Sequence, residues 1–331
     1  MVVRLTVNAA PQNPAITPSN PAPFIQRLIN VTFTLGTGTF ANTSSNTVTL
    51  SGLRASARIV NAGGYYTGLL DMDIYGMPLS LMNNLALLGQ RIQYVPRNQI
   101  VVEAGDSSTG MGIVFTGDVM EAAFDGDPAP DVPFRVEARV GAAAAVFPYP
   151  PQSFTGSTDV ATLLSGLATA AGWRFENNGV SVRIPRPYLY GSILDQITKI
   201  VQTANIQSNF GAENCLAIWP KNGNRGGAIP IIQAGGNMIG YPRFHAAGVT
   251  VRAVYSPSIG LGPAGPVSSG PNAGGGVQIG GLIQIQGSIL TAANGTWKVY
   301  ALDHVLESMV PNGQWFSTIK AIYTDQVSPI A

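Results

Sequence analysis

The sequence predicts an α+β chain that is mainly β, with two antiparallel β-barrel or β-sheet domains and a small α+β domain inserted between them. Apolar and polar residues alternate with a period of two along many short segments, as in half-buried strands. Apolar residues recur at helical spacing in only three stretches. Glycine and proline number 39 and 24 among 331 residues, which indicates many turns.

Charged residues make up only 11% of the chain, against about 25% in ordinary soluble domains. This scarcity favours an assembly subunit whose surfaces are covered by neighbours over a solitary protein. The net charge of +1 excludes a general attraction to nucleic acid. The single cysteine, Cys215, excludes an internal disulfide framework and a cysteine-based zinc cluster, and we expect it to be a small buried residue.

Residues 1–26 are short of charge and rich in proline, asparagine and serine, and are expected to form an extended N-terminal arm. A disordered tail and a strap across a neighbouring subunit both fit this composition. Ile16, Phe24 and Ile25 favour the strap, because such residues are unusual in a solvated tail. Phe24 and Ile25 are therefore candidate subunit-contact residues. The N-terminus has no secretory apolar core, and no membrane anchor is expected.

Residues 27–150 are expected to form the first β domain. One amphipathic helix is predicted over 78–88, because Leu81, Leu85 and Leu88 recur at helical spacing between Pro78 and Gly89. The expected strands lie at 31–35, 48–50, 54–60, 70–75, 100–103, 111–124 and 132–140.

The expected strand at 132–140 carries the candidate contact residues of this domain. Arg135, Glu137 and Arg139 alternate there with apolar residues. One face of this strand is therefore apolar, and the other is either exposed to solvent or covered by a partner. We expect Arg135, Glu137 and Arg139 to contact a neighbouring subunit.

Residues 151–239 are expected to form the small α+β domain, which follows a stiff linker over 147–151. One helix is predicted to open near Ser157, and a second covers 187–204. A hairpin is predicted over 175–186, with its turn at residues 177–179. Tyr188 and Tyr190 could stack a base or a sugar, although packing at a helix start is the commoner role.

Residues 240–331 are expected to form the second β domain. Strands are indicated at 248–255 and 281–286, and a hairpin covers 293–323 with its turn at Pro311-Asn312-Gly313. Residues 256–280 contain no charge and are dominated by glycine, proline and serine. We expect them to form a long loop that protrudes from one sheet, or an arm that is ordered only in the assembly.

The segments GVTVRAVYSPSI, GGLIQIQGS, NGTWKVYALDHVLES and PNGQWFSTIKAIY occur in this order between Gly248 and Tyr323. This pattern resembles the C-terminal part of the baseplate hub proteins of contractile-tailed bacteriophages of the Mu-like and marine myovirus types, which are related to the T-even phage tail hub. The resemblance implies a structural virion protein with two tail-tube-like domains, assembled in the host cytoplasm.

The resemblance also implies a homotrimeric ring of pseudo-sixfold symmetry. The ring would join the hexameric tail tube, or a tube-initiator ring protein, to the trimeric central spike, beside neighbouring baseplate proteins. DNA would pass through the lumen without specific binding, so the lumen residues should be neutral or acidic. No cofactor and no enzymatic activity are implied.

No catalytic, cofactor-binding or metal-ligating signature occurs in the sequence. Asp303 and His304 with Ser308 nearby suggest a hydrolase, but adjacent residues of a strand point to opposite faces, so a triad is not expected. Asp71 and Asp73 share one face of a strand and are expected to be solvated or lumen-facing acids. A glycan- or receptor-binding tail protein is the alternative function, and a tail-associated lytic hydrolase is a third.

Overall fold

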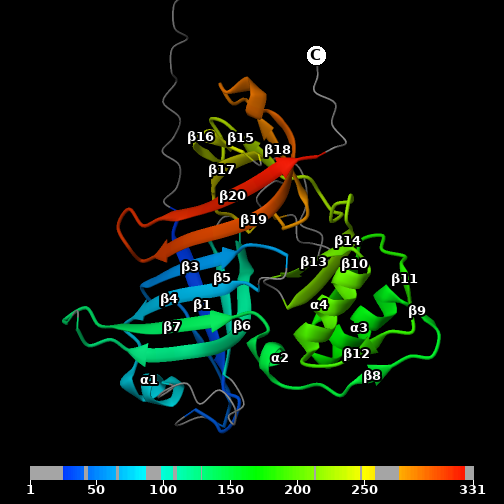
Figure 1. Ribbon diagram of the computed structural model, residues 1–331. Coiled ribbons are helices and arrows are strands. Elements are labelled where there is room, and N and C mark those ends of the chain that lie inside the picture. The colour runs from blue at the N-terminus through cyan, green and yellow to red at the C-terminus, as the bar shows by residue number, and fades with distance from the viewer. Residues whose placement is uncertain are drawn as a thin grey trace, which may run out of the picture.

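The computed structural model describes residues 25–40, 44–64, 67–86, 98–106, 110–127, 129–211, 214–246, 248–257 and 276–324. These residues form one large sheet, three small sheets and a few helices (Figure 1). The large sheet contains β1 (Arg27–Thr34), β2 (Thr47–Leu50), β3 (Ala55–Asn61), β4 (Leu69–Tyr75), β5 (Gln99–Asp106), β6 (Gly110–Phe124), β7 (Pro133–Arg139), β15 (Ile231–Gln233), β16 (Met238–His245), β17 (Gly248–Val254), β18 (Leu282–Gln286), β19 (Gly295–Ser308) and β20 (Trp315–Tyr323).

The remaining elements are short. The small sheets contain β8 (Gln152–Ser153), β9 (Ser157–Asp159), β10 (Arg174–Asn177), β11 (Arg183–Pro185), β12 (Tyr188–Leu189), β13 (Ile206–Gly211) and β14 (Cys215–Pro220). The helices are α1 (Leu79–Leu85), α2 (Ala142–Val146), α3 (Val160–Ala170) and α4 (Ile193–Thr203), and η1 (Thr291–Ala293) is a 3₁₀ turn. None of the described helices has the length and apolar character needed to cross a membrane.

The large sheet joins the two predicted β regions into one continuous structure. Its strand order is β16-β17-β20-β19-β3-β4-β7-β6-β5-β1-β2, with antiparallel neighbours throughout, and β18 branches from β19 and carries β15. The link is the pairing of β19 with β3, from Leu302 opposite Asn61 to Ser308 opposite Ala55. The sequence did not decide between closed barrels and sheets. The described strands form one sheet that does not close into a barrel.

The sheet encloses two separate hydrophobic cores. Because β6 pairs with β5 before Asp118 and with β7 after it, the sheet turns at this residue and brings β1 behind the front strands, against β19 (Figure 1). The first core lies inside this turn, where it includes Phe33 and Phe134, and continues into the small domain, where it includes Leu164 and Phe210. The second core lies under β17, β18, β19 and β20 and includes Trp297 and Ile319. We call the strands from β1 to β7, around the first core, the first β unit. We call the strands from β15 to β20, around the second core, the second β unit.

The helix predicted in the first β domain is present, and a second short helix accompanies it. α1 starts after Pro78 and ends at Leu85, three residues before the predicted end at Leu88. We expected a single helix and missed α2, because its sequence AAAAV contains no polar residues that would alternate with apolar ones at helical spacing. The Asp118 carboxylate caps α2 by accepting a hydrogen bond of 2.8 Å from the backbone N–H of Ala143.

Both helices predicted in the small domain are present with shifted starts. α3 begins after Asp159, whose carboxylate accepts from the backbone N–H of Thr162 at 2.9 Å. α4 begins only at Ile193, after a capping box formed by Ser192 and Asp195. The predicted start at residue 187 was wrong, because residues 188–189 form β12 and pair with β8.

The hairpin predicted over 175–186 was also wrong. β10 pairs in parallel with β14, and β11 pairs with β9 instead of β10. The Asn177 side chain bonds the backbone N–H and C=O of Val180 at 2.8 and 3.0 Å. This turn sends the chain away from β10 rather than back along it. We call the layer formed by α3, α4 and the sheet β10-β14-β13 the insert.

Two predicted segments fall largely outside the described residues. These are the N-terminal arm, of which Ile25 and Gln26 are described, and residues 258–275 of the loop at 256–280. β15 lies within the range predicted for the small domain, yet it pairs with β18 of the second β unit. The domain boundaries themselves stay a prediction.

Candidate assembly surface

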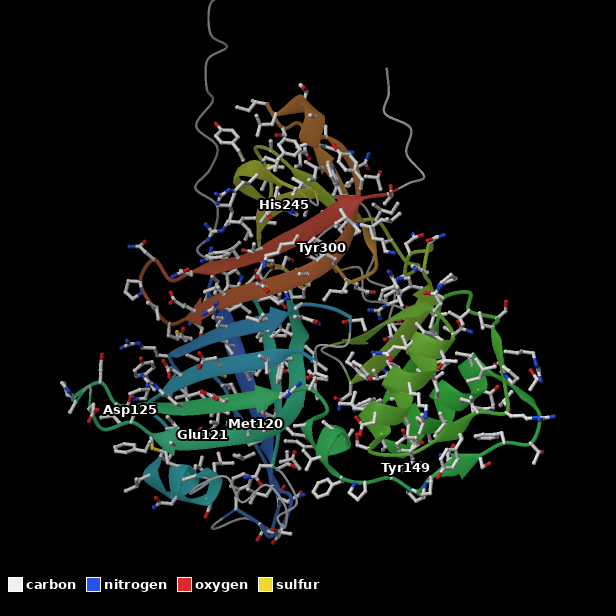
Figure 2. All side chains as sticks on the ribbon, viewed as in Figure 1. Met120, Glu121, Asp125, Tyr149, His245 and Tyr300 are labelled. Atoms are coloured by element: carbon white, nitrogen blue, oxygen red, sulfur yellow. The ribbon has the colours of Figure 1, made fainter. Side chains whose placement is uncertain are left out.

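The front strands from β16 to β6 present one solvent-exposed face, which we call the outer face. Strand registers place Arg58, Asp71, Glu137 and Glu121 directly opposite one another on β3, β4, β7 and β6. The neighbouring residues of these strands point to the first core. Figure 2 labels Glu121 near one end of this face and His245, the last residue of β16, near the other.

β7 has the predicted alternation of buried apolar and exposed charged residues. The Arg135 guanidinium lies 3.3 Å from the Asp73 carboxylate and 3.1 Å from the Asp125 carboxylate. The Arg139 Nε donates to Thr67 Oγ1 at 2.6 Å. The charged face of this strand is therefore exposed to solvent in the single chain. Its contact with a neighbouring subunit stays a prediction.

A row of carboxylates crosses the outer face from β4 to β6, with the exposed Arg135 and Arg139 beside it on β7. Asp71 lies opposite Glu137, and Glu137 lies opposite Glu121. Like charges placed directly opposite on a sheet are destabilising. Among the described residues, none of these three carboxylates has an ion-pair partner. With Arg58 and Arg139 they line a shallow depression.

Basic residues gather toward the β16 end of the same face. Arg243 and Lys320 both lie opposite Thr250, and Arg252 lies beside them on β17. The Lys320 ammonium lies 3.2 Å from the Asp303 carboxylate. The Arg252 guanidinium lies 3.9 Å from the centre of the Phe316 ring, a cation–π contact that keeps the charge at the surface.

The strands at the two ends of this face have unpaired sides in the described structure. β16 pairs only with β17. Past Val119, β6 pairs only with β7 among the described strands. Edge strands with unpaired backbone groups are ready to pair with another chain. Both ends of the outer face are therefore suited to subunit contacts.

The histidine that suggested a hydrolase lies in a structural pair. His304 lies within β19, and its Nδ1 is 2.8 Å from the Oγ of the buried Ser317. Burial lowers the pKa of His304 to about 4. Asp303 points to the outer face, as the alternation predicted, and Ser308 donates to the Leu53 carbonyl. Asp303, His304 and Ser308 therefore do not converge.

The tryptophans do not form a binding platform in the described part of the chain. Trp219, Trp297 and Trp315 are buried, and Trp173 packs edge-on against Phe210 with ring centroids 5.2 Å apart. Among the described residues, no cluster of histidine, cysteine or acidic side chains could hold a metal ion.

The exposed pair Tyr188 and Tyr190 was expected to pack at a helix start. Both tyrosines lie before α4 instead, more than half exposed, with ring centroids 5.7 Å apart. The Lys199 ammonium lies 4.2 Å from the Tyr190 ring. Tyr190 therefore packs against Lys199 and Tyr188, while more than half of its surface stays exposed.

A polar junction fixes the insert against the second β unit. The Lys298 Nζ donates to Gln207 Oε1 at 3.0 Å, and burial lowers the pKa of Lys298. Burial alone would raise the pKa of Glu176, but its ion pair with Arg225 outweighs burial and lowers it. Sequence reasoning missed this junction, because its members lie far apart in the chain.

The comparisons with known proteins agree with this architecture. A family model described as Baseplate hub gp41 matches residues 28–312. No curated protein matches by sequence. The 43 kDa tail protein of prophage MuSo2 from Shewanella oneidensis is similar with a TM-score of 0.56 at 11% identity, over 89% of this chain and 97% of that chain. The tail protein from Neisseria meningitidis MC58 also has a TM-score of 0.56, at 8% identity, over 89% and 96%.

A third similar structure comes from a secretion system. The Escherichia coli c3393 protein has a TM-score of 0.50 at 10% identity, over 82% of this chain and 74% of that chain. It is described as a component of the type VI secretion system that is structurally similar to the T4 tail proteins gp27 and gp5. At such identities the structural similarities show the fold alone.

The family follows from the family model, which covers most of the sequence and ends at the turn before β20. It confirms the resemblance seen between Gly248 and Tyr323 and extends it to the N-terminal part of the chain. The chain belongs to the Baseplate hub gp41 family and is a structural protein of the phage tail baseplate.

Proposed function

We propose that three copies of this chain form a ring of pseudo-sixfold symmetry that joins the hexameric tail tube, or its initiator ring, to the trimeric central spike. The observation that carries this proposal is the open sheet that runs through two β units with separate cores. A subunit with two β units can present six similar units when three copies meet. Closing the sheets into a ring also covers edges that would otherwise promote aggregation.

We further propose that the outer face forms the wall of the channel through which DNA passes. Proteins that hold DNA neutralise its phosphates with lysine and arginine. The outer face mixes both signs, and its acidic row Asp71, Glu137 and Glu121 is unpaired among the described residues. DNA would therefore slide along this wall without being held.

The predicted contact residues have consistent places in this ring. Arg135, Glu137 and Arg139 lie on β7, the strand next to β6, and in the single chain Arg135 bonds Asp73 while Arg139 bonds Thr67. We propose that these three residues contact the next subunit. Ile25 is 43% exposed just before β1, and Phe24 precedes it outside the described residues. We propose that the arm straps a neighbouring subunit and that the insert faces other baseplate proteins.

Light scattering on the full chain tests the ring. The chain should have three times its monomer mass, either alone or after addition of the tail tube and spike proteins of the same phage. A monomer that persists with these proteins and binds glycans would favour the receptor-binding alternative. Clearing of a cell-wall zymogram would favour a lytic hydrolase.

A further inference from the structure

The antiparallel pair of β8 and β12, which we call the tyrosine ribbon, presents an aromatic face to solvent. Tyr188 on β12 and Tyr190 directly after it lie on the same side, because Leu189 between them is buried on the other side. The two tyrosines are 56% and 58% exposed, and their ring centroids are 5.7 Å apart. The exposed Pro151 directly precedes β8, so the tyrosine ribbon combines two tyrosine rings with a proline ring.

Prolines recur with a regular spacing in the N-terminal arm. Residues 11–14 read Pro-Gln-Asn-Pro and residues 18–21 read Pro-Ser-Asn-Pro, and no charged residue occurs from Asn8 to Phe24. Proline-rich sequences favour the extended polyproline II conformation, in which residues i and i+3 lie on the same side, about 9 Å apart. Segments of this Pro-x-x-Pro type bind to aromatic surfaces, because their conformation is formed before binding and little entropy is lost.

We propose that a Pro-x-x-Pro segment in the arm of one copy packs on Tyr188 and Tyr190 of the next copy. This inference rests on the proposed strap between subunits and names the surface that receives it. The Lys199 ammonium covers one side of the Tyr190 ring, so the arm packs on the exposed remainder of both rings. The tyrosine hydroxyls can donate hydrogen bonds to carbonyls of the arm, because a polyproline II segment has no internal hydrogen bonds.

The place where the arm begins favours the next copy over the same chain. Gln26 Nε2 donates to Met309 Sδ at 3.3 Å, so the described part of the arm lies beside the turn between β19 and β20. From Ser308 to Lys298, which bonds Gln207 after the end of α4, β19 spans about 33 Å. The tyrosine ribbon precedes the other end of α4, at the lower right of Figure 1, whereas the turn lies at the left.

The arm is too short to bring residues 18–21 to the tyrosine ribbon of its own chain. At about 3.1 Å per residue, the segment from Pro21 to Ile25 spans only about 12 Å. The segment from Pro14 to Ile25 spans about 34 Å, which barely equals the length of β19 between the turn and the insert. The tyrosine ribbon of a neighbouring copy is not subject to this limit.

Disulfide trapping tests the contact in the full chain. One version carries Gln12→Cys or Ser19→Cys within a Pro-x-x-Pro segment, and a second version of different mass carries Ser153→Cys, which lies opposite Tyr188 on β8. The native Cys215 is buried. The two versions are coexpressed, assembled with tube and spike proteins where the ring needs them, and oxidised. Non-reducing electrophoresis should show a disulfide between the two masses.

The tyrosine rings should determine the yield of this disulfide. Tyr188→Ser together with Tyr190→Ser, in the version with Ser153→Cys, should lower the yield by about fivefold or more, because the rings no longer contact the prolines. Replacing the four prolines of the two segments with alanine should have a similar effect. The matched control, Tyr188→Phe with Tyr190→Phe, keeps both rings and should retain most of the yield. Circular dichroism checks that each variant is folded.

Light scattering on the same samples separates two kinds of failure. A trimer without this disulfide, or with equal yield in the serine variant, would refute the contact and leave the proposed ring intact. The same holds if a chain that bears both cysteines forms the disulfide only within itself. A chain that stays monomeric with its partners would refute the ring and this contact together. Binding of a glycan or an oligonucleotide to the two tyrosines in place of the arm would also overturn the inference.

Discussion

Acid should destabilise the folded chain through His304. Burial lowers the pKa of this imidazole to about 4, against an ordinary value of 6.5. Between these values the unfolded chain binds a proton that the folded chain does not, so stability that is present above about pH 6.5 is lost as the pH falls toward 4. One pKa unit corresponds to about 1.4 kcal/mol, which gives an upper limit of about 2.5 kcal/mol between about pH 7.5 and 4.5.

The actual loss should be about 1–2.5 kcal/mol, because part of the His304 ring lines a cavity that water can enter. Replacing His304 with asparagine removes the titrating group and keeps a polar partner for Ser317. Urea unfolding of both proteins at a series of pH values, at equal protein concentration, isolates the effect of His304 from that of the carboxylates. The wild type should lose more stability than the variant as the pH falls.

NMR gives a second measurement of the same property. The chain has only two histidines, so the His304→Asn variant assigns both imidazole signals. The His304 signal should titrate near pH 4, well below the ordinary imidazole value of 6.5. A His304 titration near pH 6.5, or equal loss of stability in the two proteins, would refute this reasoning.

Three further substitutions test the insert and its contact with the second β unit. Gly280→Ala should destabilise the chain by about 2 kcal/mol or more, because the new Cβ would overlap the Trp219 ring at a φ of +80°. Gly179→Ala has a similar φ of +86° with open space around it, so thermal unfolding should show a smaller loss for it. Ser192→Ala removes the cap of α4 and should cost about 1 kcal/mol by urea unfolding, and an unchanged midpoint would contradict the capping role.

Local patterns in the sequence predicted most strands correctly, because each half-buried strand has its own alternation. The pairing of β3 with β19 could not be predicted in this way, since no short-range signal links residues near the two ends of the chain. The same limit applies to the arrangement of charges on the outer face. Arg243 and Glu121 look like isolated charges in the sequence, and only the strand registers place them at opposite ends of one sheet.

The errors in the small domain have local causes. The segment over 175–186 contains good strand residues around an Asn-Asn-Gly turn, but β14 takes the side of β10 that the hairpin would have used. The start of α4 was placed too early because the pairing of β12 with β8 involves only two residues on each strand. Such short pairings are set by tertiary contacts rather than by local preference.

An image of the tail end by electron cryomicroscopy, with this chain labelled, tests the central proposal most directly. Three copies should surround the tail axis between the tube and the spike, with the outer face of the front sheet toward the channel. A different copy number, a position away from the axis, or an outer face turned from the channel would contradict the proposed hub.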